Sequence, residues 1–239
     1  MNFSNVSISG NRSVINGVVY NGSVSIINGQ VFVDGKLQNG GGQSIKGDGQ
    51  AAEESRNLSD HFTRVEASGI NGLQIKCGSS EEKLQLQGES NILPLIETRV
   101  EDGTLHIGPK PGESFSTNQP IQVTLFMDNL DNLELSGSVD SQVSGLHSER
   151  LNLDLSGSSK VKLEGTARKL DLDLSGASSA SAMGLMVDDV RADMSGASKA
   201  FVAPRNTLEV DGSGASSLAY QGNPKVSKDL SGAAQLHQL

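Results

Sequence analysis

Apolar and polar residues alternate along the C-terminal half of the chain, and the alternation restarts at a regular interval. In one repeat, Leu153 and Leu155 lie four and two positions before Gly157, with a polar residue between them. Alternation with a period of two indicates a strand that buries one face. The alternation resumes at Val161 and Leu163, four and six positions after the same glycine. Each repeat therefore predicts two short strands that meet at a corner.

A short phrase ending in Gly marks this corner six times, and its glycines are 20, 19, 20, 18 and 18 residues apart. A period this short is typical of a solenoid, and helical solenoid repeats need about 33 residues or more. A parallel β-helix fits better, in which each strand pairs with its counterpart about 4.8 Å away in the next coil. The copies are Leu135-Ser136-Gly137, Leu155-Ser156-Gly157, Leu174-Ser175-Gly176, Met194-Ser195-Gly196, Gly212-Ser213-Gly214 and Leu230-Ser231-Gly232.

Two further columns are predicted in each coil. Glycine or proline recurs eight residues after the corner glycine, which indicates a second turn. A small residue follows every corner glycine, and we expect these residues to stack inside the corner, where larger side chains would overpack. The second-turn residues are Gly145, Gly165, Gly184, Pro204 and Gly222, and the small residues are Ser138, Ser158, Ala177, Ala197, Ala215 and Ala233.

The remainder of the chain divides at a polar segment. In residues 1–37, apolar pairs flank Asn16-Gly17 and Asn28-Gly29, which predicts a short β-hairpin or meander segment. Residues 38–59 are rich in glycine and polar residues and predict a linker. Residues 60–239 are then the β-helix domain, with degenerate coils over 60–130 and regular coils over 131–239. The predicted fold class is all-β.

Weaker versions of the repeat precede the regular coils. Residues 65–69 and 84–88 have the alternation of early coils and lie 19 residues apart. Residues 96–100 and 104–107 flank Glu101-Asp102-Gly103 and predict a hairpin. Residues 121–127 predict a strand that leads into the first regular coil.

Several motifs occur in a fixed order from about residue 60 onward. They are Phe62-x-x-Val65-x-Ala67-Ser68-Gly69, Val100-Glu101-Asp102-Gly103-Thr104-Leu105-x-Ile107, Pro120-Ile121-x-Val123, Leu133-x-Leu135-Ser136-Gly137-Ser138, the repeated Asp-Leu-Ser-Gly coils and Tyr220-x-Gly222-x-Pro224. With these motifs the chain resembles the bacterial family called the putative auto-transporter adhesin head GIN domain. The resemblance implies a right-handed β-helix on an exported protein, with an adhesive role and no catalytic residues. The N-terminal 50 residues lie outside the family pattern.

Composition excludes several classes of function. The chain has 239 residues, of which 35% are hydrophobic and 3% aromatic, which suits the thin core of a solenoid. Its net charge of −9 argues against binding to nucleic acid or to an anionic membrane surface. No apolar run approaches the length of a membrane span, and the single Cys77 excludes an intramolecular disulfide. The first residues have no features of a secretory signal and predict the cytoplasm, whereas the resemblance implies the cell surface or periplasm.

The position three before each corner glycine is acidic in all six copies. Because it alternates with buried residues, it is expected to face outward, with neighbouring carboxylates about 5 Å apart. Carboxylate oxygens suit Ca²⁺, so a column of them is a candidate cation- or ligand-binding site; the alternative is a solvated face. The residues are Glu134, Asp154, Asp173, Asp193, Asp211 and Asp229.

No pattern in the sequence predicts an enzyme. The histidines, at 61, 106, 147 and 237, lack metal-site spacing, and the corner serines lie in no nucleophile-elbow motif. Cys77 has no identifiable acid–base partner. We therefore predict no catalytic residues, no cofactor and no resident metal.

The last coil stops before its second turn, so Leu236 and Leu239 are predicted to form an interface with another subunit. The favoured function is a non-catalytic adhesin-like module that presents a rigid surface to a protein or glycan. The alternatives are a scaffold that stacks end to end through its C-terminal coil and, less favoured, a carbohydrate-active β-helix enzyme, because the chain has few aromatic residues.

Overall fold

The computed structural model describes residues 44–58 and 60–239 in full and, among residues 6–38, the backbone of six short strands. The chain forms two compact units. One contains residues 1–46 and 111–116, and the other contains residues 47–110 and 117–239. Each is described by itself below, and the predicted domain boundaries stay a prediction.

The first unit has small antiparallel sheets. β2 pairs with β3, and β4 pairs with β5, which confirms the two predicted hairpin pairings. The Asn-Gly residues of their turns lie outside the described residues. The strands of the antiparallel sheets are β1 (Val6–Ser9), β2 (Arg12–Ile15), β3 (Val18–Asn21), β4 (Val24–Ile27), β5 (Gln30–Val33) and β6 (Lys36–Gln38). In addition, β7 (Ile45–Lys46) pairs in parallel with β14 (Phe115–Ser116).

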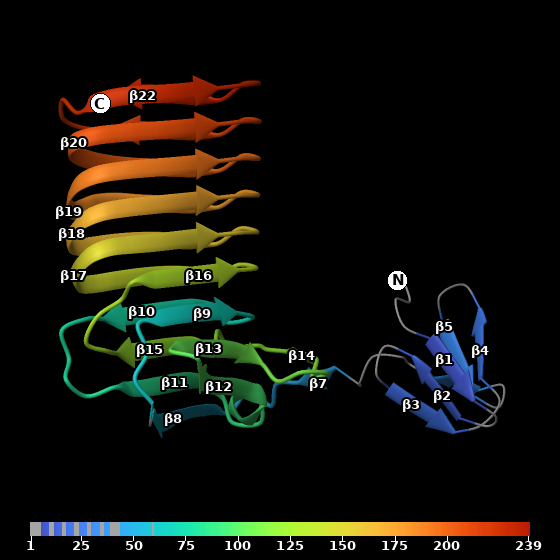
Figure 1. Ribbon diagram of the computed structural model, residues 1–239. Coiled ribbons are helices and arrows are strands. Elements are labelled where there is room, and N and C mark those ends of the chain that lie inside the picture. Colours follow the sequence, from blue (N-terminus) through green and yellow to red (C-terminus); the bar gives the residue numbers. More distant parts are fainter. Residues whose placement is uncertain are drawn as a thin grey trace. The chain divides into compact units, whose positions relative to one another are not determined.

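The second unit is a β-helix with two sheets whose inward side chains are buried against each other. Figure 1 shows its regular coils stacked in chain order from β16 to β22. The strands before the coils are β8 (Ala51–Asn57), β9 (Arg64–Ser68), β10 (Gly72–Lys76), β11 (Lys83–Glu89), β12 (Ile96–Glu101), β13 (Thr104–Pro109) and β15 (Gln122–Phe126). The strands of the coils are β16 (Asn132–Ser136), β17 (Asp140–Leu155), β18 (Lys160–Leu174), β19 (Ser179–Met194), β20 (Lys199–Gly212), β21 (Ser217–Tyr220), β22 (Lys225–Leu230) and β23 (Gln235–Gln238).

The two sheets share the long strands of the coils. We call the first sheet the one that contains the segments leading into the Ser-Gly corners together with β12 and β13. Its order is β12-β13-β9-β16-β17-β18-β19-β20-β22. The second sheet contains the segments that follow the corners together with β8, β11 and β15, and its order is β8-β11-β15-β10-β17-β18-β19-β20-β21-β23. All pairs among the coils are parallel, which confirms the predicted parallel β-helix.

The register places the predicted core residues on top of one another. Leu153 pairs with Leu172, which in turn pairs with Ala192, and Ala192 pairs with Val210. All four side chains are at least 97% buried. In the last coil Lys228 continues this column and Val226 continues the column of Leu208, and both are exposed because no further coil covers them.

Each Ser-Gly corner stacks directly on the corner of the preceding coil. From Gly157 onward the five corner glycines have φ between +69° and +71°, in the left-handed region that favours glycine. The carbonyl oxygen of Gly157 accepts a hydrogen bond from the amide of Ala177 at 2.7 Å, and the contact repeats at every later corner. The residue after each corner glycine is exposed, so the prediction that it lies inside the corner is wrong.

The residue that fills the corner is the next one along the chain. Ser159, Ser178, Ser198 and Ser216 form a column in which every side chain is at least 97% buried. Their side chains are small enough for the narrow corner. Small residues do stack inside the corner as predicted, but they stand one position later in the chain than predicted.

The predicted second turn is a bend within a continuous strand in most coils. β17, β18 and β19 run through Gly145, Gly165 and Gly184 without interruption, and the pairing register shifts at or just before these residues. A β-bulge of this kind turns a strand sharply while keeping most of its hydrogen bonds. Only between β21 and β22, at Gly222, does a loop replace the bend.

The N-terminal part of the β-helix differs from the predicted degenerate coils. Residues 65–69 do form an early rung, because β9 pairs in parallel with β16. Residues 84–88 lie in β11, which is antiparallel to both β15 and β8, so their assignment to a coil is wrong. The predicted hairpin is confirmed as β12 and β13.

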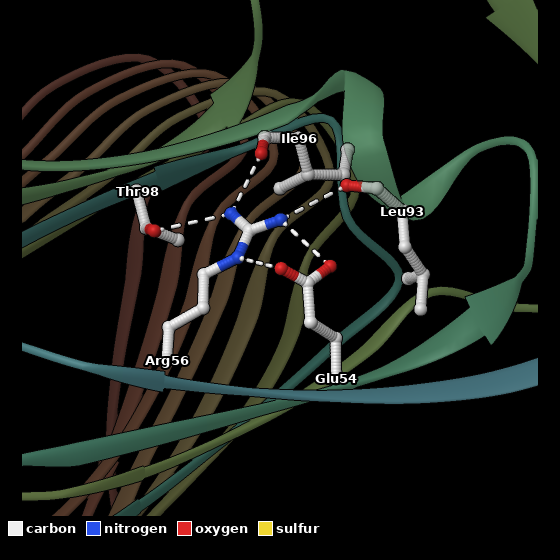
Figure 2. A network of polar contacts seen from close by, with 5 residues as sticks. All are labelled: Glu54, Arg56, Leu93, Ile96 and Thr98. Atoms are coloured by element: carbon white, nitrogen blue, oxygen red, sulfur yellow. Dashed lines mark hydrogen bonds and ion pairs between the residues drawn. The ribbon is translucent and has the colours of Figure 1, made fainter.

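The predicted linker is also wrong for residues 51–57, which form β8 along the full length of β11. Every second side chain of β8 is half-buried, and two of these are Glu54 and Arg56, so polar composition conceals the strand. Arg56 donates to the carbonyl oxygens of Leu93 and Ile96 at 3.1 and 2.7 Å, and to the hydroxyl of Thr98 at 3.1 Å. Figure 2 shows this guanidinium held against Glu54 as well, at 2.9 Å.

The network around Arg56 closes the N-terminal end of the β-helix. Leu93–Leu95 form a short 3₁₀ helix, η1, that connects β11 in the second sheet to β12 in the first. Its carbonyl at Leu93 and that of Ile96 have Arg56 as their partner, and the side chains of Leu93 and Ile96 are buried. Inward-pointing charged residues on an edge strand also prevent further strand pairing.

A buried carboxylate fixes the segment before β8. Glu89 is completely buried and accepts hydrogen bonds from the amide of Gly49 at 2.6 Å and from the amide and side chain of Asn118 at 2.8 and 3.0 Å. Burial acts to raise the pKa of Glu89, but these hydrogen bonds together with one from Gln119 outweigh it and lower the pKa. The interaction joins three segments that are far apart in the sequence.

Candidate functional site

The acidic residues predicted from the repeat form one straight column on the outward side of the first sheet. Direct pairing in register connects Glu134, Asp154, Asp173, Asp193, Asp211 and Asp229 in that order. The column extends further than predicted, since Glu134 pairs with Glu66 of β9, and Glu66 pairs with His106 of β13. The Nδ1 atom of His106 lies 2.8 Å from the carboxylate of Glu66, so the run of carboxylates ends at an imidazole, and Arg99 of β12 follows His106 in register.

Neighbouring carboxylates shift the pKa of two members of the column, Glu134 and Asp154. Burial raises the pKa of Glu134, and the carboxylates of Glu66 and Asp154 raise it further, while His106 acts in the opposite direction. Burial and Asp173 raise the pKa of Asp154. Asp193 is paired with a basic side chain of its own coil, Arg191, at 3.3 Å. The column is thus a line of mutually repelling carboxylates.

Two shallow cavities lie beside this column. One, of about 260 Å³, is lined by Asp154, Asp173 and Asp193 together with Asn152 and Arg191. The other, of about 190 Å³, lies at the N-terminal end of the column and is lined by Glu66, Glu97, His106 and Glu134, among others. Within the described residues, no three His, Cys, Asp or Glu side chains are arranged to hold a metal ion. The cation-binding interpretation of the column stays a prediction, and a calorimetric calcium titration tests it.

A larger cavity of about 550 Å³ lies on the same face, farther from the corners. Its charged groups are largely paired with one another. Arg150 lies 3.7 Å from Asp171, Arg191 lies 3.9 Å from Glu209, and the hydroxyl of Thr207 donates to Asp189 at 2.6 Å. This cavity is an open, polar depression in the first sheet.

The predicted interface residues lie at the C-terminal end of the stack. β22 pairs only with β20, and β23 pairs only with β21, so each has one edge without a partner strand among the described residues. Leu239 is 69% exposed and Leu236 is half-buried. Leu236 continues the column of Leu218, which is 1% exposed one coil earlier.

Other candidate groups remain separate from one another. His61 contacts Glu82 at 2.8 Å, His147 contacts Thr166 at 2.8 Å, and His237 contacts Gln235 at 2.9 Å. Burial, with a smaller contribution from Asp128, raises the pKa of the Cys77 thiol to about 11, which makes the reactive thiolate scarce at neutral pH. The hydroxyls of the corner serines Ser175, Ser213 and Ser231 donate to backbone carbonyls of the previous coil at 3.4 to 3.5 Å.

Residues 61–224 match the family described as putative auto-transporter adhesin, head GIN domain. The match spans most of the β-helix, including the first five Ser-Gly corners and the acidic column as far as Asp211. The chain belongs to this family. The GIN domain therefore explains the ordered motifs, and the predicted resemblance is confirmed. No curated protein matches the chain in sequence.

Solved structures with a similar fold come from Bacteroides and Parabacteroides. A putative adhesin from Bacteroides fragilis is 19% identical with a TM-score of 0.68, over 82% of this chain and 100% of that one. A putative adhesin from Parabacteroides distasonis is 18% identical with a TM-score of 0.57, over the same shares. A putative lipid binding protein from P. distasonis is 15% identical with a TM-score of 0.53, again over 82% and 100%. At these identities the likeness shows the fold of the GIN domain. Among the described residues, no helix has the length and apolar character needed to cross a membrane.

Proposed function

We propose that this GIN domain is a non-catalytic, adhesin-like module that binds a protein or glycan on the outward faces of its β-helix at the cell surface or in the periplasm. The observation that carries the proposal is the column geometry. Outward side chains of successive coils lie in straight lines about 4.8 Å apart over a fully buried core. A surface held this rigidly loses little conformational entropy when it binds, which favours recognition of extended partners.

Binding to purified probes tests the proposal. The intact chain, fluorescently labelled, is applied to an array of purified polysaccharides and extracellular proteins, and the array is then assayed for released reducing ends. We expect saturable binding to at least one probe without release of reducing ends. Chain-dependent cleavage of a polysaccharide would replace the adhesin proposal with the carbohydrate-active enzyme, and no binding to any probe would remove it.

A second candidate function, end-to-end self-assembly, is favoured by the C-terminal end of the stack. The free edges of β22 and β23 and the exposed Leu239 suit a contact with a second copy through Leu236 and Leu239. Lys228 points inward on β22 and opposes strand pairing there, so we place this function second. Sedimentation velocity at tens of micromolar distinguishes the two functions: oligomers that dissociate in L236D/L239D support the scaffold, and a monomeric wild-type chain removes it.

A further inference from the structure

The outward side of the second sheet carries another surface, distinct from the acidic column on the first sheet. Two columns of side chains run along it in register over four coils. One column contains Lys160, Ser179, Lys199 and Ser217, and the other contains Lys162, Ser181, Phe201 and Ala219. We call these eight residues, with Met183 beside Ser181, the lysine face.

Large apolar side chains are exposed on this face. Phe201 is 39% exposed and Met183 is 38% exposed, although both lie on strands whose inward residues are buried. The neighbours of Phe201 in the adjacent coils are Ser181 and Ala219, and neither is long enough to cover an aromatic ring. Phe201 therefore stands above a platform of small side chains, with Lys199 two positions before it on the same strand.

Two of the three lysines of this face form no ion pair with a described residue. Among the described residues, Lys160 and Lys199 have no carboxylate within ion-pair distance, although Asp140 of the preceding coil pairs in register with Lys160. Lys162 has one ion-pair partner, Glu164 at 2.6 Å. The first sheet has the opposite character, because its outermost column is a line of carboxylates. A chain with a net charge of −9 thus presents a locally basic surface on one side.

The spacing of these groups indicates the shape of the partner. Lys160 and Lys199 are separated by one coil, or about 10 Å, and Lys160 and Lys162 lie about 7 Å apart along the strand. A flat sheet with cations at these intervals is complementary to an extended chain that carries anionic groups at regular intervals. The exposed aromatic ring adds a surface for the apolar face of a sugar.

We infer that the lysine face binds an anionic polysaccharide. Lys160, Lys162 and Lys199 contact its carboxylate or sulfate groups, and a sugar ring packs on Phe201 next to Met183. The inference rests on the proposed adhesin-like function and names the class of ligand and the surface that takes it. The competing occupant is a second copy of the chain, whose acidic column has the same repeat as the lysine face.

Binding of the intact chain to defined polysaccharides tests the inference by calorimetry at low and high ionic strength. The probes are polygalacturonate for carboxylate groups, dextran sulfate for sulfate groups and dextran as the neutral control. We expect binding to at least one anionic polymer, weaker binding at high salt, and none to dextran. Since the chain itself is strongly acidic, general electrostatic attraction to a polyanion would not produce this result.

Substitutions then locate the surface. K160A/K199A should weaken binding at least about tenfold, and F201A by a similar factor, because each removes a separate contact. The control K169A/K225A changes the net charge equally but lies on the first sheet, and it should bind like the wild type. Circular dichroism verifies that each variant is folded.

Each other outcome overturns the inference. Equal loss in K160A/K199A and K169A/K225A would mean that the lysine face is not the site. Binding to dextran alone, or to proteins alone on the array, would leave the adhesin-like function standing and remove the anionic ligand. Concentration-dependent self-association that disappears in K160A/K199A would assign the face to a second copy of the chain.

Discussion

Gly176 lies so close to Gly157 that a Cβ atom added to Gly176 would be 2.6 Å from the carbonyl oxygen of Gly157. The same residue has φ of +69°, where side chains other than glycine are strained. The corner thus needs glycine for two reasons, conformation and close approach. At Gly137 only the first reason applies, because φ is +87° but no atom lies within 4 Å of its Cβ position.

We therefore expect G176A to be much more destabilising than G137A. G137A should lower the free energy of unfolding by roughly 1–2 kcal/mol, the cost of the left-handed conformation alone. G176A should cost about 3 kcal/mol or more, because the stacked backbone must also move. Urea denaturation of both variants measures the difference, and equal losses would show that close stacking at the corner is not important.

Substitution of a serine in the buried column should not destabilise the protein, in contrast to substitution of a corner glycine. The hydroxyl oxygens of Ser159, Ser178 and Ser198 have no hydrogen-bond partner among the described residues. Val139 and Ala234 occupy the same position in the first and last coils, so the hydroxyl is not required by the fold. S178A should leave the free energy of unfolding unchanged or raise it by about 1 kcal/mol, because it removes an unpaired polar group.

Ser148 provides the control for that substitution. It is also buried, but its hydroxyl donates to the carbonyl of Arg150 at 2.9 Å and to Asp131 at 3.2 Å. S148A should therefore lower the free energy of unfolding by about 1 kcal/mol. A loss in S178A as large as that in S148A would reveal a hydrogen bond to the buried hydroxyl.

The regular coils could be predicted because the residues that determine the structure of one coil recur in the next. Inward Leu153 and Leu172, outward Asp154 and Asp173, and the left-handed glycines recur with one period, so one coil explains the others. β8 could not be predicted, since its inward side chains include Glu54 and Arg56, which are stabilised by contacts with residues about 40 positions away. Local composition carries no information about such contacts.

The acidic column shows the same limit. Its six regular members follow from the repeat, whereas Glu66 and His106 were missed, although Glu66 also lies three residues before a Ser-Gly glycine, Gly69. The sequence motif was present, but the next rung begins only at Asn132. The intervening residues form strands of the second sheet and the N-terminal end, and no periodicity indicates that the chain returns to β9.

Removing a carboxylate from the middle of this column should stabilise the protein. A folded-state pKa above the ordinary value means that the ionised group opposes folding, so stability falls as pH rises through that pKa. D154N should thus raise the free energy of unfolding at neutral pH by on the order of 1 kcal/mol or less, and the gain should shrink in high salt. D140N is the control, because Asp140 pairs in register with Lys160, and no gain is expected. Thermal unfolding at two salt concentrations measures both effects, and a loss of stability in D154N would contradict the repulsion.

Arg56 should contribute far more to stability than an exposed arginine. R56A removes a guanidinium that is 18% exposed, together with its hydrogen bonds to the carbonyls of Leu93 and Ile96 and its ion pair with Glu54. The loss should be about 3 kcal/mol. Arg99, which pairs with Glu101 on the surface, is the control, and R99A should change the free energy of unfolding by less than about 1 kcal/mol. Similar losses in the two variants would show that the N-terminal end does not depend on this network.

Glu89 should make the β-helix sensitive to acid. Its folded-state pKa is lowered from the ordinary value of 4.5, so its contribution is complete above that pH and is lost as pH falls through the lower folded-state pKa. E89Q should be less stable than the wild type at neutral pH, because an amide group then faces the donors of Gly49 and Asn118. Its stability should also fall less steeply below pH 4.5, since one linked proton is absent. The control E53Q changes an exposed glutamate on β8, and its stability should depend on pH as steeply as that of the wild type. Urea titrations across this pH range measure the free energy of unfolding of the three chains. If stability falls with pH equally steeply in E89Q and the wild type, Glu89 is not the source of the acid sensitivity.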